Sequence, residues 1–421
     1  MKKPNVYYGY WIVAVAFFCQ FIQAGAVSYA FPLLYRPLQA EFDWGRGTIA
    51  VAYTIYFATM GLASPFIGRI VDRYGARMVI PCGALMVGLG FLFLSLVQNL
   101  WSFYVSYIVI GLGMVAMGPV SATQTISSWF TRRRGLAVGI MATGIGVEGF
   151  VLAPIIGAFL IPNLGWRTTY LAMAILTWVL IIPAALLVIR SKPSDMGLYP
   201  DGVATAEAVT EAKLSSKTSE SWPVNMAIKT STFWLISVAF AANTFSNAGI
   251  FQHQVNHLTD IGFSLAAAAT ALGAVGLGSA GGKLIFGWLC DRLPAKYVAT
   301  ISFALQLVAL IILINVKSTS PLVMLWAYAI LIGLGIGGWI PTMSMLISRN
   351  FGLGSYGTIF GMLMLTHSLS TALGPLAAGF MYDAMQTYYW VFIMFLTLFT
   401  ISIPSMLAVR RPKLHLSSGQ Q

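Results

Sequence analysis

Charged residues are scarce in this chain. Only 9% of its 421 residues are Asp, Glu, Lys or Arg, whereas 58% are hydrophobic. Soluble domains contain about 25% charged residues, so this composition excludes a soluble globular protein. Acidic residues are scarcer than basic ones, with 12 Asp and Glu against 24 Lys and Arg. The chain must meet a largely apolar solvent, which indicates a membrane protein.

Cysteines and catalytic motifs are also lacking. Cys19, Cys82 and Cys290 fall in or beside apolar runs, without paired spacing or a nearby group of histidines. This pattern indicates neither a disulfide framework nor a metal site. The sequence has no GxxxxGK[ST] or HExxH motif, and no GxSxG motif in a strand-turn-helix context. We therefore expect neither an enzyme nor a cofactor.

Long apolar runs make up most of the chain. A run of about 20 residues crosses roughly 30 Å of hydrocarbon, and the first run is too long for a removed signal peptide. We predict an all-α membrane protein with twelve transmembrane helices. They are expected at 9–33, 47–67, 79–97, 101–123, 135–160, 167–189, 232–257, 264–289, 297–316, 322–346, 356–381 and 388–409.

The basic residues are distributed unevenly between the two sides of these spans. With the N-terminus inside, nineteen of the 24 Lys and Arg residues fall in inner loops and tails. Arg36, Arg46, Arg167 and Lys317 fall outside, and Lys283 alone lies within a span. This positive-inside bias predicts a multi-pass protein of the plasma membrane, a bacterial inner membrane, with both termini cytoplasmic. We therefore attribute the net charge of +12 to loops on the inner side of a lipid bilayer, and we expect no nucleic-acid partner.

The chain also repeats itself. GRIVDRYGAR at 68–77 returns as GWLCDRLPAK at 287–296, which pairs an Asp-Arg dipeptide in each copy. IGLGMVAMGP at 110–119 returns as IGLGIGGWIP at 332–341, and the spacing between these two copies also relates two pairs of glycines farther along. These matches predict two six-helix halves in parallel orientation.

A polar gap rich in Ser, Thr, Ala, Glu and Lys separates the two halves. We expect the N-terminal half at 1–189, a cytoplasmic linker at 190–230, the C-terminal half at 231–409 and a cytoplasmic tail at 410–421.

Several of these motifs resemble known transporters. GRIVDRYGAR resembles the loop between helices two and three of the major facilitator superfamily. Segments at 7–13, 129–149, 194–202 and 253–264 are similar to the monocarboxylate porter and oxalate/formate antiporter branch. The resemblance covers the whole chain. It implies a secondary transporter of a small monocarboxylate or related organic anion, coupled to protons and working by alternating access. We expect it to function as a monomer.

Two alternatives stay open. GxxxAPxxGA at 149–158 partly resembles the helix-five pattern of proton-driven multidrug exporters, with Ala153 at its middle glycine. A non-transporting membrane sensor of the same fold would bind its ligand without accumulating it. Competition by lipophilic cations would favour the exporter, and the absence of counterflow in proteoliposomes would favour the sensor.

The repeated loop motif predicts a cytoplasmic gate. Asp72, Arg73 and Arg77 in the first copy, and Asp291 and Arg292 in the second, can pair across the ends of neighbouring helices. We expect this cluster to hold one of two conformations. The alternative is that the arginines only fix the topology.

Polar side chains within apolar spans mark a candidate substrate site, because they are costly in hydrocarbon and turn inward. Lys283 is the one basic residue of this kind. The resemblance places it where monocarboxylate porters carry an arginine that binds the substrate carboxylate, although lysine lacks the planar fork of arginine. Snorkelling toward the cytoplasm is the alternative. The other candidates, which could also form simple interhelical hydrogen bonds, are Gln20, Gln23, Asn243, Asn247 and His367.

Three residues are candidates for proton coupling. Glu148 is the only acid deep within an expected span. Its depth differs from that of Lys283 by roughly 9 Å, so an ion pair between them fits poorly. His253 and His257 lie one helical turn apart near the outer surface, where an unperturbed imidazole titrates near pH 6.5. The alternative for both histidines is a solvated side chain at the membrane interface.

Overall fold

A computed structural model describes residues 7–24, 31–44, 46–202, 222–263, 265–317 and 320–412. These residues form helices joined by short turns, and they include no strand. Ten helical stretches are long and apolar enough to cross a membrane, and two shorter apolar helices, Gly9–Ile22 and Arg134–Val147, accompany them. The predicted all-α membrane fold is confirmed.

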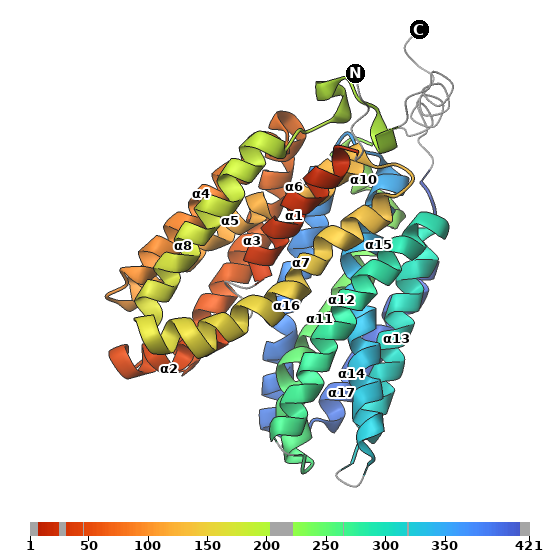
Figure 1. Cartoon of the computed structure of the whole chain (residues 1–421). Helices are drawn as coiled ribbons and strands as arrows, with labels where there is room; N and C mark the ends of the chain where they lie inside the picture. The colour runs from red at the N-terminus through yellow and green to blue at the C-terminus, as the bar shows by residue number, and fades with distance from the viewer. Residues whose placement is uncertain are drawn as a thin grey trace.

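The helices form two bundles of similar size (Figure 1). The first contains α1 (Gly9–Ala24), α2 (Phe31–Phe42), α3 (Arg46–Tyr74), α4 (Ala76–Ser95), α5 (Leu100–Met117), α6 (Pro119–Trp129), α7 (Arg134–Pro154), the π-helix η2 (Ile155–Leu160) and α8 (Ile161–Val188). The second contains α11 (Ser231–Asp260), α12 (Leu265–Arg292), α13 (Ala295–Asn315), α14 (Leu322–Gly337), α15 (Trp339–Phe351), α16 (Tyr356–Met385) and α17 (Tyr389–Leu407). Between them lie the short helices η3 (Pro193–Met196), η4 (Pro200–Gly202) and α10 (Val224–Ala227).

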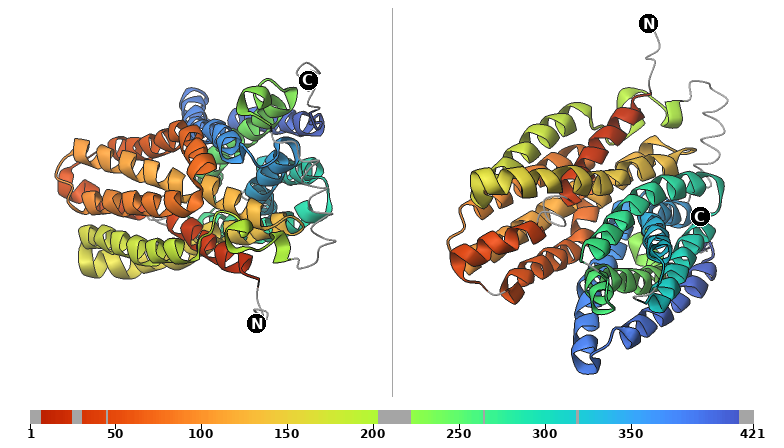
Figure 2. Two further views of the ribbon diagram at one scale, coloured as in Figure 1. Left: turned by 90° about the horizontal axis from the view of Figure 1, so that it is seen from above. Right: turned by 60° about the horizontal axis from the view of Figure 1, so that its bottom comes forward.

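The two bundles meet along two helix pairs, α3 with α16 and α7 with α12. They lie close together at the end where α1, α7 and α16 begin, and they diverge toward the end that carries α2 (Figures 1 and 2). We call the first the closed end and the second the far end. This arrangement agrees with the predicted parallel repeat, since equivalent helices of each half form the two contacts. The residue boundaries expected for the halves, linker and tail stay predictions.

Glycines allow both helix pairs to approach closely. A Cβ on Gly139 of α7 would lie 2.4 Å from the backbone oxygen of Lys283 on α12. A Cβ on Gly361 of α16 would lie 2.3 Å from the backbone oxygen of Ser64 on α3. Gly361 is the repeat equivalent of Gly139, and Lys283 is that of Ser64, so the two interfaces use the same contact. Small residues at such crossings let membrane helices pack backbone to backbone.

Two transmembrane stretches are broken within two residues of corresponding positions in the repeat. The break between α5 and α6 lies at Gly118, directly before Pro119, and the break between α14 and α15 lies at Gly338. Proline has no N–H to donate, so the helix before it is left with an unpaired carbonyl. The Ser121 hydroxyl donates to the Ala116 oxygen at 2.6 Å and thereby pairs another carbonyl in the last turn before the break. A protein side chain thus supplies a hydrogen bond to a backbone carbonyl, which the hydrocarbon of a lipid bilayer could not do.

The predicted boundaries are wrong in three places. The motif GRIVDRYGAR was expected in a loop, but α3 continues through Tyr74 and the chain turns only at Gly75, whose φ is 77°. Likewise α12 continues through Arg292. The first expected span, 9–33, is too long, because α1 ends at Ala24 and a separate helix α2 begins at Phe31. In α3 and α12 the charged residues of the last turns interrupt the apolar pattern, although the helix itself continues.

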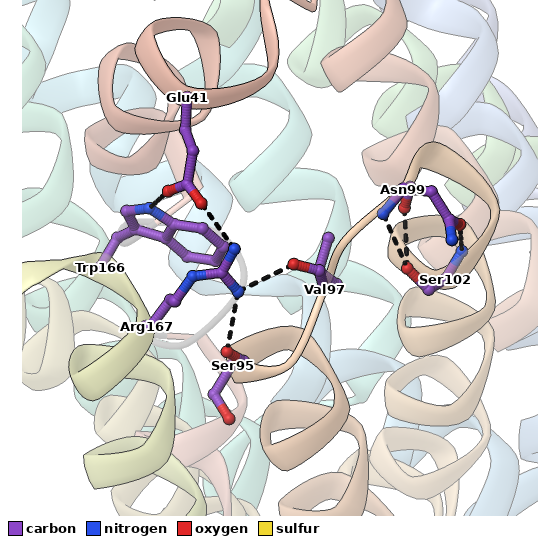
Figure 3. A network of polar contacts seen from close by, with 7 residues as sticks. All are labelled: Glu41, Ser95, Val97, Asn99, Ser102, Trp166 and Arg167. Atoms are coloured by element: carbon purple, nitrogen blue, oxygen red, sulfur yellow. Dashed lines mark hydrogen bonds and ion pairs between the residues drawn. The ribbon is translucent and has the colours of Figure 1, made fainter.

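Helix α2 is attached to the first bundle by a polar network at the far end (Figure 3). Glu41 accepts hydrogen bonds from Trp166 Nε1 at 2.7 Å and from Arg167 Nη2 at 2.6 Å. Arg167 Nη1 also donates to the backbone oxygens of Ser95 and Val97. The guanidinium lies 4.3 Å from the Trp166 ring centroid. One carboxylate thus joins α2 to the start of α8 and, through Arg167, to the end of α4.

Candidate functional site

A cavity of about 180 Å³ lies among α11, α14, α15 and α16, with Tyr53 of α3 on its wall. Three of the predicted site residues line it, namely Asn243, Asn247 and His367. The first two lie one turn apart on α11, and the third comes from α16. The structure therefore brings together polar residues that are far apart in the sequence.

A chain of amides backs this cavity. Gln306 on α13 donates from Nε2 to the backbone oxygen of Ser302 at 3.1 Å, so its Oε1 must face the other way. That oxygen accepts hydrogen bonds from the side-chain amides of both Asn243, at 3.0 Å, and Asn247. Asn247 Nδ2 also donates to Asn243 Oδ1 at 3.0 Å. Because a backbone carbonyl can only accept, Ser302 fixes the orientation of all three amides.

Sequence reasoning missed Gln306 and Ser302. Both are buried, each 1% exposed. The signal was available, because Gln306 is a polar side chain in the middle of an apolar span, the same criterion that selected Asn243. Its partnership with α11 could not be deduced from the sequence, because no spacing relates α13 to α11.

His367 is held on the cavity wall by two helices. Its Nδ1 lies 3.0 Å from the Thr244 hydroxyl of α11. Its ring stacks on Trp339, with centroids 4.3 Å apart and planes 14° from parallel. Trp339 begins α15, directly after the break at Gly338. The broken helix thus supplies an aromatic face that orients the imidazole.

Lys283 lies outside the lining of this cavity. It is 3% exposed, and its Nζ donates to Ser279 Oγ at 2.8 Å. Within the described part of the chain, no carboxylate forms an ion pair with it. A Cβ on Gly337 of α14 would lie 2.6 Å from its backbone nitrogen. Lys283 thus lies between α7 and the end of α14. Two residues beside that end, Ile336 and Trp339, line the cavity.

The remaining candidates on α1 and α7 are described only in part. Gln20 is fully buried, and its Nε2 lies 3.9 Å from the Met141 sulfur of α7. Its Oε1 is buried without a hydrogen-bond partner among the described residues. The side chains of Gln23 and Glu148 lie outside the described residues. Gly146 packs against Ala280, so position 148 of α7 lies level with residues that precede Ala280 on α12, away from Lys283.

His253 and His257 lie in a separate aromatic cluster. His253 Nε2 lies 3.0 Å from the Pro375 oxygen, and since that carbonyl only accepts, Nε2 carries the proton and donates. Nδ1 lies 3.2 Å from the Tyr388 hydroxyl of the turn before α17. The His257 ring meets Phe392 edge-on with centroids 4.7 Å apart. Pro375 also lines the cavity, so His253 stands directly behind its wall.

The predicted gate residues fall at the closed end, where Asp72 and Asp291 form reciprocal contacts. Asp72 of α3 accepts hydrogen bonds from the backbone N–H groups of Gly357 and Thr358 at 2.9 and 2.8 Å. Asp291 of α12 accepts from those of Gly135 and Leu136 at 2.6 and 2.9 Å. Each carboxylate therefore binds the N-terminus of a helix in the other half, where the helix dipole favours negative charge.

The predicted pairing of these acids with arginines is wrong. Asp72 accepts its two further hydrogen bonds from the Thr358 hydroxyl and from Gln124. The residues Arg73, Arg77 and Arg292 are exposed, and the guanidinium of Arg292 lies 3.7 Å from the Trp288 ring centroid. Backbone N–H groups at a helix start replaced the guanidinium as partner, an arrangement that the sequence motif does not reveal.

Two helical bundles that meet at one end, and a cavity walled by α11, α14, α15 and α16 with Tyr53 of α3, fit a membrane transporter rather than an enzyme. The chain matches the Major Facilitator Superfamily over residues 15–370 and again over residues 234–421. It belongs to that superfamily.

Relatives cover almost the whole chain. Monocarboxylate transporter 11 of Homo sapiens is 27% identical over 397 residues, which are 90% of this chain and 78% of the relative. The uncharacterized MFS-type transporter YcxA of Bacillus subtilis (strain 168) is 27% identical and is matched over 90% of each chain. The predicted resemblance to monocarboxylate porters is confirmed.

A solved structure shares the fold. The chain superposes on the transporter FucP in its outward conformation with a TM-score of 0.70 and 13% identity, over 96% of this chain and 100% of that one.

Proposed function

We propose that the chain is a secondary active transporter of a small monocarboxylate or related organic anion, coupled to protons and working by alternating access. The names of its monocarboxylate transporter relatives support this substrate class. The observation that carries the proposal is Lys283, whose buried ammonium donates to one neutral hydroxyl. An ammonium away from water costs several kcal/mol unless it meets an anion. A substrate carboxylate would supply that anion.

The substrate would use both Lys283 and the cavity. Gly337 and Gly338 separate Ile336 from Trp339 in the chain, and Gly337 rests on the backbone of Lys283. A small movement at this break would connect the ammonium to the space lined by His367 and Asn247. Glycines make such a movement possible, because they adopt many backbone conformations. The carboxylate would then meet Lys283 while the rest of the anion faces Trp339 and the amides.

The direction in which the site opens follows from the charges at the closed end. Exposed arginines gather there, namely Arg73, Arg77, Arg132, Arg133 and Arg292, and the positive-inside rule makes them support a cytoplasmic location for this end. The far end, toward which the two bundles diverge (Figure 1), would then face the outside, and the substrate would enter from there.

Proton coupling is proposed for His253, with His257 and Glu148 as further candidates. The Nε2–H of His253 donates to Pro375, a residue of the cavity wall, so a proton gained at Nδ1, which faces Tyr388, would put a positive charge on a ring that is bonded to that wall. Neutral His can accept from Tyr388 at Nδ1, whereas charged His can only donate to it. Loss or gain of a proton would therefore reverse this hydrogen bond.

Uptake into proteoliposomes tests the proposed function. The purified protein should accumulate one or more radiolabelled acids from a panel of lactate, pyruvate, formate, oxalate and small aromatic acids. An inward proton gradient should increase the accumulation, and a protonophore should remove that increase. The proposed function is wrong if no acid accumulates while lipophilic cations are transported. If an acid is exchanged at a rate that does not depend on the proton gradient, only the proposed proton coupling is wrong.

A further inference from the structure

The segment after α8 returns across the closed end and binds the first half. Trp129 Nε1, at the end of α6, donates to the Arg190 oxygen at 2.8 Å. Farther along, one carboxylate oxygen of Asp201 accepts from the backbone N–H groups of Thr131 and Arg132 at 3.0 and 2.9 Å. Both donors lie in the turn between α6 and α7. Asp201 has a φ of 59°, a left-handed conformation that Asp adopts more readily than most residues.

On the other side of residues 203–221, the chain binds the second half in a similar place. The Trp222 N–H donates to the Phe351 oxygen at 3.0 Å. The two rings meet edge-on with centroids 6.3 Å apart, and Trp222 is 7% exposed. Phe351 ends α15, so this contact lies at the turn between α15 and α16.

These two turns are equivalent in the repeat. Phe351 is separated from Trp129 by the same spacing that separates Gly357 from Gly135. Each turn leads directly into the helix whose first N–H groups bind a carboxylate from the opposite half, α7 for Asp291 and α16 for Asp72. Each described end of the linker therefore binds a turn, and the helix that follows that turn contacts the opposite half through its first N–H groups.

We propose that Asp201 and Trp222 are positioning residues for these two interdomain contacts. Asp201 holds the turn before α7 where Asp291 can bind its N–H groups, and Trp222 does the same before α16 for Asp72. Together they favour the conformation that is closed at this end. The proposal rests on the alternation of two conformations in the proposed function, but it assigns the linker a part in the conformational equilibrium that does not depend on the substrate.

The linker acts through these turns rather than as a wedge. A cavity of about 640 Å³ lies between Pro193–Pro200 and the residues Leu353 and Gly354 of the second half. The segment therefore spans a space at this point instead of filling it. Hydrogen bonds from two N–H groups to a carboxylate are charge-assisted and stronger than neutral ones, so Asp201 supplies the firmer of the two attachments.

The test measures the conformational equilibrium without substrate. Spin labels at Leu164→Cys and Leu322→Cys, exposed positions near the starts of α8 and α14, report the separation of the halves at the far end by electron–electron distance measurement. The full-length protein in lipid nanodiscs carries Cys82→Ala, because Cys82 is exposed whereas Cys19 and Cys290 are buried. The ratio of long to short distances gives the equilibrium between the two conformations.

Asp201→Ala should lower this ratio at least fivefold, Asp201→Asn should lower it less, and Trp222→Ala should lower it in the same direction. Asp195→Ala is the matched control, because Asp195 binds the Lys192 N–H within the same segment. An unchanged ratio in Asp201→Ala and Trp222→Ala would overturn the proposal, as would an equal effect of Asp195→Ala. Since no substrate is added, a wrong substrate class would leave these results unaffected.

Discussion

Asp72 and Asp291 bind equivalent backbone positions in opposite halves of the protein. The two acceptors occupy the same place in the repeated motif, and the donors Gly357 and Thr358 are the repeat equivalents of Gly135 and Leu136. Each half thus gives a carboxylate and receives one. Such a pair of contacts would break together if the two bundles separated at the closed end, as the proposed alternation of two conformations requires.

Removing either charge should slow transport. Asp72→Asn and Asp291→Asn each keep the size of the side chain but weaken charge-assisted hydrogen bonds, which contribute about 1.5–3 kcal/mol each. We expect turnover to fall at least fivefold at equal abundance in the membrane, measured as initial uptake rate per protein. Arg73→Gln is the control, because Arg73 is exposed and its guanidinium lies over the neighbouring Tyr74 ring. Normal turnover in both Asn variants would show that the contacts do not limit the cycle.

Close helix packing gives a second prediction, on stability. Gly361→Ala would place a methyl group 2.3 Å from the Ser64 oxygen, and backbone cannot move aside as a side chain can. Overpacking of this kind costs about 1–3 kcal/mol, so the thermal unfolding midpoint in detergent should fall. Gly276→Ala on α12 meets nothing within 4 Å and should leave the midpoint unchanged. Equal midpoints for both variants would refute the packing at Gly361.

The amides behind the cavity should depend on Gln306. Gln306→Leu removes the acceptor shared by Asn243 and Asn247, and a buried polar group without a partner costs about 1–3 kcal/mol. We expect weaker substrate binding and a lower thermal midpoint. Gln306→Glu keeps the acceptor but loses the N–H that donates to the Ser302 oxygen, so it should restore binding only in part. The orientation assigned to the amides is wrong if leucine binds substrate as tightly as the parent protein.

The network around Glu41 predicts a dependence on pH. The hydrogen bond from Arg167 holds the pKa of Glu41 below its ordinary value of 4.5. The stabilisation is therefore present above about pH 4.5 and is lost as the pH falls through the lower pKa of the folded protein. Both side chains are partly exposed, so the contribution is no more than about 1 kcal/mol. The thermal midpoint of the parent should approach that of Glu41→Gln on acidification, and a constant difference down to pH 3 would contradict this.

The sequence predicted the helical membrane fold and its repeat because both depend on apolar spacing and repeated motifs. It also selected Asn243, Asn247 and His367, since a polar side chain in an apolar span stands out. Gln306 meets the same criterion, but the choice of partner helix depends on packing between distant segments. The partners of Asp72 and Asp291 could not be predicted, because they are backbone groups, which every residue carries. Asp201 lies in the segment 194–202 that carries part of the family resemblance, but nothing in the sequence relates it to the turn between α6 and α7.

The central claim is that Lys283 binds the carboxylate of the substrate. The most direct measurement is equilibrium binding of the acid that the transport panel identifies, to purified Lys283→Gln, Lys283→Arg and Ser279→Ala proteins. Glutamine removes the charge and should weaken binding at least fiftyfold without lowering the thermal midpoint. Arginine should retain binding, and Ser279→Ala, which removes only the hydroxyl that Lys283 contacts, should bind like the parent. A Lys283→Gln protein that binds the acid with near-normal affinity would contradict the account.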